Sequence, residues 1–135
     1  MIKTVNIEKS FNGKVVLQGI TTTFYAGKTN LIIGRSGAGK TVLLKILVGL
    51  LPPTSGTVWY DTTDFTSLGK KEVLNIRKEI GMLFQGSALF DFMNIQDNIS
   101  FPLDMFTNMS KGEKLDRVNE CLQRVGLVDV NAKFP

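Results

Sequence analysis

The stretch GRSGAGKT, from Gly34 to Thr41, decides the fold of this chain. It fits the pattern G-x-x-x-x-G-K-[ST], a glycine-rich turn that joins a strand to a helix. The flanking sequence agrees, because a short apolar run at residues 31–33 precedes the turn and a helical pattern at 42–51 follows it. Glycines let the backbone approach a phosphate group closely, and the helix contributes the positive end of its dipole. The stretch is therefore predicted to hold phosphate groups.

The two residues that close the motif have predicted roles of their own. Lys40 carries the charge that reaches the terminal phosphates, and the hydroxyl of Thr41 is placed to ligate Mg²⁺. The alternative is a glycine-rich turn that only closes a strand–helix corner, and the agreement between motif and flanks disfavours it. We expect a nucleoside triphosphate as the ligand.

The composition bounds the size and the surroundings of the chain. Its 135 residues are 43% hydrophobic, enough for one packed domain, and its single cysteine, Cys121, excludes an internal disulfide. No apolar run is long enough to span a bilayer, and the first residues lack the order of a signal peptide. These features predict a cytoplasmic protein.

The net charge of +4 is distributed unevenly along the sequence. Residues 1–60 contain seven Lys and Arg against one acidic residue, whereas residues 61–135 contain nine against eleven. The basic excess therefore surrounds the glycine-rich turn, which suits a polyphosphate ligand. Basic residues do not alternate with aromatic residues in a stripe, so no nucleic-acid partner is predicted.

Apolar periodicity and turn residues predict an α/β chain. The dipeptide Asn12-Gly13 predicts a hairpin turn, so an antiparallel hairpin precedes a parallel strand–turn–helix unit. The pattern S-x-x-E at Ser110 predicts the start of the last helix and Gly126 its end, while Pro102 is expected to stop the helix before it. The predicted strands are 2–10, 15–25, 29–33, 57–60 and 82–84, and the predicted helices are 42–51, 70–80, 94–100 and the run that ends before Gly126.

Three positions outside the glycine-rich turn are candidate ligands of a nucleotide or of Mg²⁺. Phe11 lies at the hairpin tip, where an aromatic ring either packs in the core or is exposed to stack on a purine. Gln85 ends a predicted buried strand, so its amide could ligate Mg²⁺ and orient a water molecule; a solvated loop side chain is the alternative. Asp61 ends an apolar run as a magnesium-binding carboxylate would, but that run is short and Thr62 follows, so we interpret it as a strand end entering a turn.

The loop after Gln85 is unusually apolar for an exposed segment. It contains Ala88, Leu89, Phe90, Phe92 and Met93. Such a loop either folds under another part of the structure or forms a contact surface for another protein.

The ordered set of these features resembles the nucleotide-binding subunits of ABC transporters over all 135 residues. Phe11 resembles the adenine-stacking aromatic of that family, GRSGAGKT its Walker A motif, and the run from Ile80 to Gln85 the lead-in to its Q-loop. The run from Leu83 to Ile99 is most similar to one branch, the ATPases of bacterial phospholipid-trafficking systems that work with MCE-domain proteins. The resemblance therefore implies transport of a phospholipid or of another hydrophobic substrate.

The same resemblance implies the fold of a P-loop NTPase, with a RecA-like core and an N-terminal antiparallel hairpin. Residues 1–86 would form the N-terminal part of the ATP-binding core, and residues 87–135 the Q-loop and the beginning of a helical subdomain. The family's LSGG signature and Walker B acid are missing, and the chain contains no histidine for the switch position. We therefore expect a fragment cut before the signature motif and inactive as an ATPase by itself.

Ligands and partners also follow from the resemblance. ATP and Mg²⁺ would be bound, with Lys40 and Gln85 as catalytic residues and Thr41 and Gln85 as metal ligands. The intact subunit would pair with a second copy, contact a membrane permease through the segment after Gln85, and work at the inner face of the cell membrane. The residues expected to contact the nucleotide are Phe11, Gly34, Ser36, Gly37, Gly39, Lys40, Thr41 and Val42.

Two other functions stay open. The chain could be a nucleotide-binding or permease-docking module without turnover of its own. It could also be a small phosphate-loop kinase, but such a kinase needs an acceptor pocket and an Arg-rich lid, and the segment after Gln85 offers neither.

Overall fold

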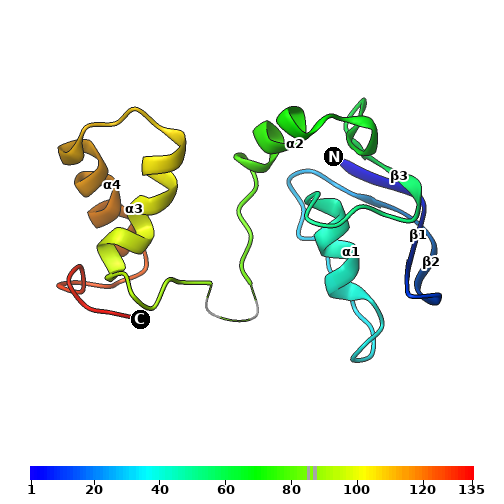
Figure 1. Ribbon diagram of the computed structural model, residues 1–135, viewed down its shortest axis with the longest axis horizontal. Helices are drawn as coiled ribbons and strands as arrows, with labels where there is room; N and C mark the ends of the chain where they lie inside the picture. Colours follow the sequence, from blue (N-terminus) through cyan, green and yellow to red (C-terminus); the bar gives the residue numbers. More distant parts are fainter. Residues whose placement is uncertain (85, 87) are drawn as a thin grey trace. The chain divides into compact units, whose positions relative to one another are not determined.

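The computed structural model describes residues 1–84, 86 and 88–135. The chain divides into two compact units, Met1–Gly81 and Met82–Pro135 (Figure 1). The family resemblance predicts a boundary between core and helical subdomain after residue 86. The boundary between the two compact units lies five residues earlier, after Gly81.

The first unit is built on a four-stranded antiparallel sheet with the strand order β2-β1-β3-β4. Asn12 and Gly13 join β1 to β2 with φ angles of 47° and 80°, the left-handed conformation that a two-residue hairpin turn requires. The predicted hairpin is therefore confirmed. The strands are β1 (Ile2–Phe11), β2 (Lys14–Phe24), β3 (Ser55–Tyr60) and β4 (Thr63–Asp64).

Strand β1 has a bulge in its middle. Asn6 has a φ of 53°, and the register of β1 against both of its neighbours shifts around this residue. As a result Thr4 and Ile7, three positions apart, both point inward and are fully buried. Gly56 of β3 lies so close to the bulge that an added Cβ would stand 2.3 Å from the carbonyl oxygen of Asn6. The bulge therefore depends on glycine at position 56.

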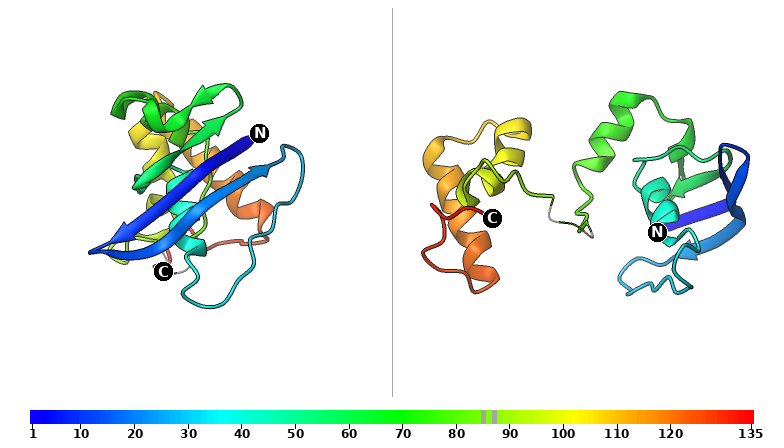
Figure 2. Two further views of the ribbon diagram at one scale, coloured as in Figure 1. Left: turned by 90° about the vertical axis from the view of Figure 1, so that its right-hand side faces the viewer. Right: turned by 60° about the horizontal axis from the view of Figure 1, so that its bottom comes forward.

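Helix α1 (Lys40–Leu47) lies against one face of this sheet (Figure 2). The hydroxyl of Tyr60 in β3 donates a 2.7 Å hydrogen bond to the carbonyl oxygen of Leu47, and burial raises the pKa of Tyr60. This bond fixes the end of α1 to the sheet. The buried core of the unit consists of Ile7, Leu17, Leu43, Ile46, Leu47, Val58 and Phe65.

The segments between and after these elements complete the first unit. They include the short 3-10 helix η1 (Phe65–Ser67) and α2 (Lys70–Arg77). Asp61 lies in the turn after β3 with a φ of 51°, and its carboxylate accepts a 2.8 Å hydrogen bond from the Met1 ammonium group. The interpretation of Asp61 as a strand end entering a turn is confirmed.

Helix α1 ends earlier than predicted, since Gly49 has a φ of 70° that a helix cannot contain.

Two predicted strands are wrong. Residues 29–33 and 82–84 form no strand, and Leu31, Ile33 and Leu83 are 81%, 81% and 98% exposed. A strand needs a hydrogen-bonded neighbour for its backbone groups, and no described residue pairs with either segment. The sheet of the described chain is therefore wholly antiparallel, without the parallel strand expected before the glycine-rich turn.

The second unit contains the helices α3 (Ile95–Phe106) and α4 (Lys111–Arg124), which pack against each other. The prediction that Pro102 stops the helix is wrong, because α3 continues past it to Phe106. A proline removes only one N–H from the helix, and the contacts with α4 hold the following turn in place.

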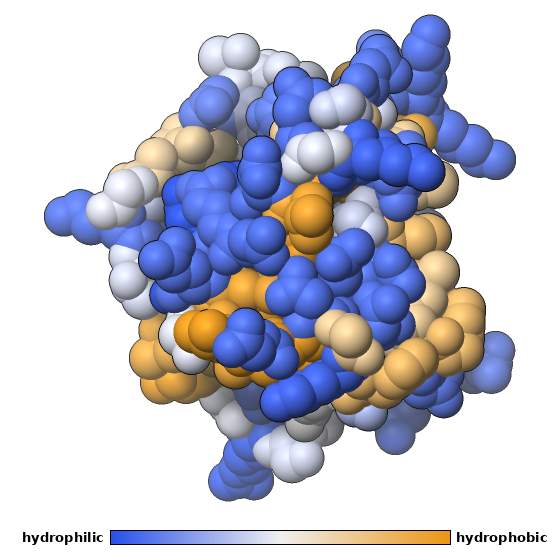
Figure 3. Space-filling view, turned by 90° about the vertical axis from the view of Figure 1, so that its left-hand side faces the viewer, coloured by the Kyte–Doolittle hydropathy of each residue, from blue (hydrophilic) through white to orange (hydrophobic). Residues whose placement is uncertain are grey.

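No helix in the described ranges is both long and apolar enough to cross a membrane. Figure 3 shows one face of the molecule, largely hydrophilic with apolar side chains gathered between the polar ones.

Both ends of α4 are as predicted. The Ser110 N–H donates a 2.7 Å hydrogen bond to the Glu113 carboxylate, and the Glu113 N–H donates to Oγ of Ser110. Hydrogen bonds from the side chain and the backbone of Ser110 lower the pKa of the Glu113 carboxyl. At the other end Gly126 has a φ of 72°, and the N–H of Leu127 donates to the carbonyl oxygen of Leu122 at 3.0 Å. The capping box and the glycine stop are confirmed.

Candidate nucleotide-binding site

The glycine-rich turn runs from Gly34 to Gly39 and leads directly into α1. Gly37 and Gly39 have φ angles of 77° and 86°, in the left-handed region that residues with a side chain rarely adopt. The N–H of Ala38 donates to the carbonyl oxygen of Arg35 at 3.2 Å, which closes a tight bend. The turn is therefore compact and depends on its glycines.

The first turn of α1 has backbone N–H groups without a protein acceptor. Gly39 is the N-cap and provides no side-chain hydrogen bond. Within residues 1–84, the N–H groups of Lys40, Thr41 and Val42 donate to no protein atom, and the first helical bond joins the Leu43 N–H to the Gly39 carbonyl at 2.8 Å. Unpaired donors at the positive end of a helix bind anions, phosphate groups above all.

The side chain of Lys40 crosses back over the turn. Its ammonium group donates hydrogen bonds of 2.8 Å to the carbonyl oxygens of Gly34 and Arg35. Among the residues that the structure describes, no carboxylate forms an ion pair with Lys40. An uncompensated positive charge therefore lies on the turn, beside the unpaired N–H groups. This combination favours a polyanionic ligand.

Thr41 presents an oxygen atom next to the same turn. The residue is exposed, and its hydroxyl has no hydrogen-bond partner in the described part of the chain. Mg²⁺ prefers oxygen ligands and usually combines one or two protein oxygens with phosphate oxygens and water. The exposed hydroxyl of Thr41 therefore fits a metal that is bound together with a phosphate ligand.

The remaining predicted contacts differ in how the structure places them. Ser36 is exposed on the turn, whereas the side chain of Val42 packs against the core, so that Val42 offers only its N–H to a ligand. Phe11 is 42% exposed at the end of β1 and does not pack in the core. Gln85 lies outside the described residues. The turn and the start of α1 thus bring seven of the predicted residues together.

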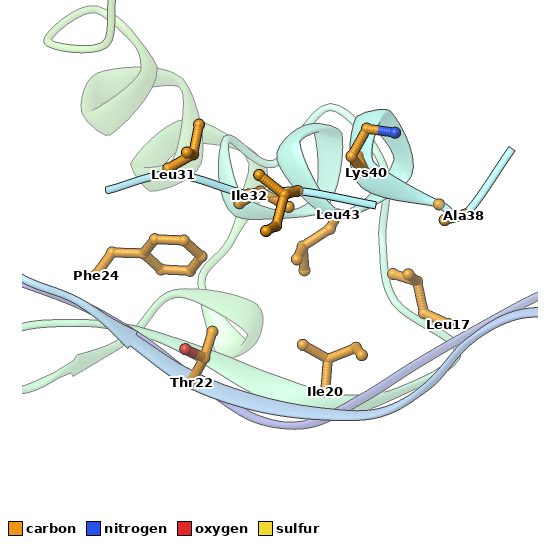
Figure 4. Close-up of a pocket in the computed structure, with 11 residues that line it drawn as sticks. Leu17, Ile20, Thr22, Phe24, Leu31, Ile32, Ala38, Lys40 and Leu43 are labelled. Carbon is orange, nitrogen blue, oxygen red and sulfur yellow. The ribbon is translucent and has the colours of Figure 1, made fainter. Parts of the chain in front are cut away.

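An apolar hollow of about 380 Å³ lies behind the turn, between β2, α1 and residues 31–33 (Figure 4). The side chains of Leu17, Ile20 and Leu43 point into it, while the ammonium group of Lys40 points away from it (Figure 4). A triphosphate in this hollow would lose its hydration against a lining that is mostly apolar. The hollow is therefore not the phosphate site, although both are close to α1.

One residue near the candidate site was missed from the sequence. The Nζ atom of Lys9 lies 5.2 Å from the centroid of the Phe11 ring and donates a 2.7 Å hydrogen bond to the carbonyl oxygen of Pro52. No motif contains this lysine. The available signal was its position two residues before Phe11, which places both side chains on one face of a strand.

Replacing Gly39 with alanine is expected to weaken the binding of Mg·ATP to the full-length protein about ten-fold. The φ of Gly39 costs roughly 1–2 kcal/mol for a residue with a Cβ. The new Cβ would also stand 2.7 Å from Cδ2 of Leu17, so the turn must shift. Its N–H groups would then no longer point at the phosphate oxygens. Isothermal titration calorimetry measures the loss.

The matched control is Gly27→Ala. Gly27 also has a positive φ, 66°, but an added Cβ would meet no atom within 4 Å. We expect its affinity for Mg·ATP to equal that of the unmodified protein. Equal affinities for the Gly39 and Gly27 variants would show that the shape of the turn does not matter for binding.

A comparison with known protein families matches residues 17–135 to the family described as ABC transporter. The matched range contains the glycine-rich turn, α1 and the whole second unit. The chain belongs to the ABC transporter family.

Two curated members of this family show how far the similarity extends. The chain is 41% identical over 134 residues to "Probable ribonucleotide transport ATP-binding protein mkl" of Mycobacterium leprae, covering 99% of this chain and 39% of that protein. It is 35% identical over 136 residues to "Cell division ATP-binding protein FtsE" of Escherichia coli K12, covering 100% of this chain and 61% of that protein. The chain thus spans about two fifths and three fifths of these relatives. Neither name mentions a phospholipid.

Solved structures confirm the predicted fold class. The ATP-binding cassette MJ0796, solved as a dimer in a post-hydrolysis state with ADP and Pi, aligns with a TM-score of 0.88 at 29% identity and covers 100% of this chain and 62% of its own. CbiO1 of Clostridium perfringens, part of the ABC transporter complex cbiONQ, aligns with a TM-score of 0.80 at 26% identity and covers 98% of this chain and 53% of its own. The chain therefore has the α/β fold of P-loop NTPases of the ABC type.

Proposed function

We propose that this chain binds ATP as part of the ATP-binding subunit of an ABC transporter. The observation that carries the proposal is the set of unpaired N–H groups at the start of α1 beside the uncompensated charge of Lys40. The membership of the family and the ADP and Pi bound to MJ0796 support a nucleotide as the anion. Residues 1–86 belong in this proposal to the ATP-binding core, and residues 87–135 to the Q-loop and the helical subdomain.

In this proposal, residues of the turn and of the start of α1 hold the ligand. The N–H groups of the turn and of the first helical positions donate to phosphate oxygens, and Lys40 neutralises charge on the β- and γ-phosphates. Thr41 and Gln85 supply oxygen atoms to Mg²⁺, which neutralises further phosphate charge when bound. Gln85 also orients the attacking water. The remaining contacts come from Phe11, Gly34, Ser36, Gly37, Gly39 and Val42.

Binding and turnover of ATP by the full-length protein test this proposal. Calorimetry is expected to show saturable binding of Mg·ATP, and phosphate release is expected to continue over many turnovers. Absence of ATP binding by a folded protein would overturn the proposal.

The alternative is a nucleotide-binding and permease-docking module without turnover. The measurement that separates the two is phosphate release by residues 1–135 compared with the full-length protein. Multiple turnovers by residues 1–135 would exclude the module, and binding without turnover by the full-length protein would favour it.

Two partners follow from the relatives. MJ0796 is dimeric in its solved structure, and cbiO1 is part of the complex cbiONQ, so we propose a second ATP-binding subunit and a membrane permease as partners. The permease contact is assigned to the segment after Gln85, where Leu89 and Phe92 are 52% and 72% exposed. Such a subunit works at the cytoplasmic face of the cell membrane.

The rings of this segment form a cluster within the second unit. The ring centroid of Phe90 lies 5.5 Å from that of Phe92 and 5.1 Å from that of Phe101 in α3. The side chain of Asn98 accepts from the Phe90 N–H at 2.7 Å and donates to the carbonyl oxygens of Phe90 and Met93 at 2.9 and 3.0 Å. Asn98 therefore holds the exposed loop on the helix.

Asn98→Ala is expected to loosen this loop without unfolding α3. The backbone groups of Phe90 lose their partner, and the loss of these hydrogen bonds corresponds to roughly 2 kcal/mol. The Phe90 amide should then exchange its hydrogen about 30-fold faster, which amide hydrogen exchange measures. The control is Asn108→Ala, since the exposed side chain of Asn108 has no partner in the described part of the chain. An unchanged exchange rate at Phe90 would disprove the role of Asn98.

A phospholipid or another hydrophobic molecule is proposed as the transported substrate. The support is the run from Leu83 to Ile99 alone, and the names of the two relatives mention ribonucleotide transport and cell division instead. The permease complex, reconstituted in vesicles, distinguishes these candidates. Stimulation of its ATPase by phospholipid but not by ribonucleotides would support lipid transport, and the reverse would exclude it.

A further inference from the structure

The aromatic ring at the hairpin tip is covered on one side by a cation. The residue Phe11 is 42% exposed, and the Nζ atom of Lys9 lies over its ring at 5.2 Å from the ring centroid. This distance is within the range in which an ammonium group is attracted to the negative face of a ring. One face of Phe11 therefore already has a partner.

Lys9 is held in this position by the backbone that follows α1. Its ammonium group donates a 2.7 Å hydrogen bond to the carbonyl oxygen of Pro52, and no carboxylate in the described ranges forms an ion pair with it. The same segment is bonded to β1, because the Thr54 N–H donates to the carbonyl oxygen of Glu8 at 2.8 Å and the Ser10 N–H donates to Oγ1 of Thr54 at 3.0 Å. These bonds fix the lysine, and with it the ring, relative to the segment that follows the phosphate-binding helix.

We propose that Lys9 is a positioning residue for the purine base of the nucleotide. It occupies one face of the Phe11 ring and leaves the opposite face for adenine. This inference rests on the proposed function, since it takes ATP as the ligand and Phe11 as the stacking residue.

Two physical effects follow from this arrangement. The cation holds the ring in one orientation, so less side-chain freedom is lost when the base binds. It also draws electron density toward itself, which makes the opposite face of the ring a better partner for the electron-rich purine. Both effects act on the base and not on the phosphates.

Calorimetry of the full-length protein with ATP and with inorganic tripolyphosphate tests the proposal. Lys9→Met keeps the length of the side chain and removes its charge, and it should weaken ATP binding about three- to five-fold. Binding of tripolyphosphate, which has no base, should stay unchanged. Lys9→Arg keeps a cation and a donor and should restore the affinity for ATP.

A second substitution shows whether Lys9 acts through the ring. In a protein that carries Phe11→Leu, the additional change Lys9→Met should have no further effect on ATP binding. The inference is overturned if Lys9→Met leaves ATP binding unchanged, lowers the affinity for tripolyphosphate equally, or costs as much beside Phe11→Leu as alone. Absence of ATP binding by the unmodified protein would overturn the proposed function and this inference together, whereas the preceding outcomes overturn the inference alone.

Discussion

Replacing Lys40 with alanine is expected to weaken the binding of Mg·ATP to the full-length protein about 100-fold, roughly 3 kcal/mol. The ammonium group lies over the turn, where it donates to the carbonyl oxygens of Gly34 and Arg35. Beside it are N–H groups that have no protein acceptor in residues 1–84. A charge-assisted hydrogen bond to phosphate is about twice as strong as a neutral one, so its loss should dominate the affinity. Isothermal titration calorimetry gives the affinity directly.

The control for this experiment is on the same helix. Lys45 is exposed in the last turn of α1, away from the start of the helix. Lys45→Ala removes the same charge and should change the affinity less than two-fold, because an exposed charge without a direct contact to the ligand contributes little. Thermal unfolding of both variants shows whether the turn still folds. An affinity for Mg·ATP that survives Lys40→Ala would contradict the assignment of this lysine.

Gly56→Ala is expected to lower the free energy of unfolding by at least about 3 kcal/mol. Gly56 has a φ of 86°, which costs roughly 1–2 kcal/mol for alanine. The added Cβ would also stand 2.3 Å from the carbonyl oxygen of Asn6 and 2.6 Å from that of Val5. These atoms belong to the backbone of the β1 bulge, so β3 must move away from β1. Urea unfolding followed by circular dichroism measures the change.

Gly13→Ala separates the two contributions to this cost. Gly13 has nearly the same φ, 80°, but an added Cβ would meet no atom within 4 Å. Its substitution should therefore cost only the conformational contribution, roughly 1–2 kcal/mol. If the two variants have the same free energy of unfolding, the close contact between β3 and the bulge does not contribute to the cost of Gly56→Ala.

Features that depend on a few neighbouring residues were predictable from the sequence. The hairpin turn at Asn12-Gly13, the capping box at Ser110 and the glycine stop at Gly126 each depend on local backbone conformation. The glycine-rich turn is of the same kind, since its motif specifies both the conformation and the donors. The left-handed conformation of Gly37 and Gly39 was therefore predictable, whereas the phosphate-binding role of the turn and of Lys40 stays a prediction.

Features that depend on distant partners were not predictable. Residues 29–33 and 82–84 have the composition of strands, but a strand forms only beside a hydrogen-bonded neighbour, and the described chain provides none. Continuation of α3 past Pro102 depends on packing against α4. The bulge at Asn6 depends on Gly56, which is far from it in the sequence.

The candidate site shows the same limit. Lys9 approaches Phe11 because the carbonyl of Pro52 fixes its ammonium group, and no local pattern encodes that contact. Asn98 likewise contacts a loop whose path follows from the ring contacts of Phe90. Side chains that support a site by hydrogen bonds to backbone carbonyls are therefore difficult to predict from a sequence pattern.

The phosphate-binding role of the turn from Gly34 to Thr41 is tested most directly by the backbone amide signals of the full-length protein. In ¹H–¹⁵N spectra recorded during a titration with Mg·ADP, the amides of Gly37, Gly39, Lys40, Thr41 and Val42 are predicted to show the largest shifts and to saturate together. Nucleotide binding that calorimetry detects while these amides keep their positions would contradict the account.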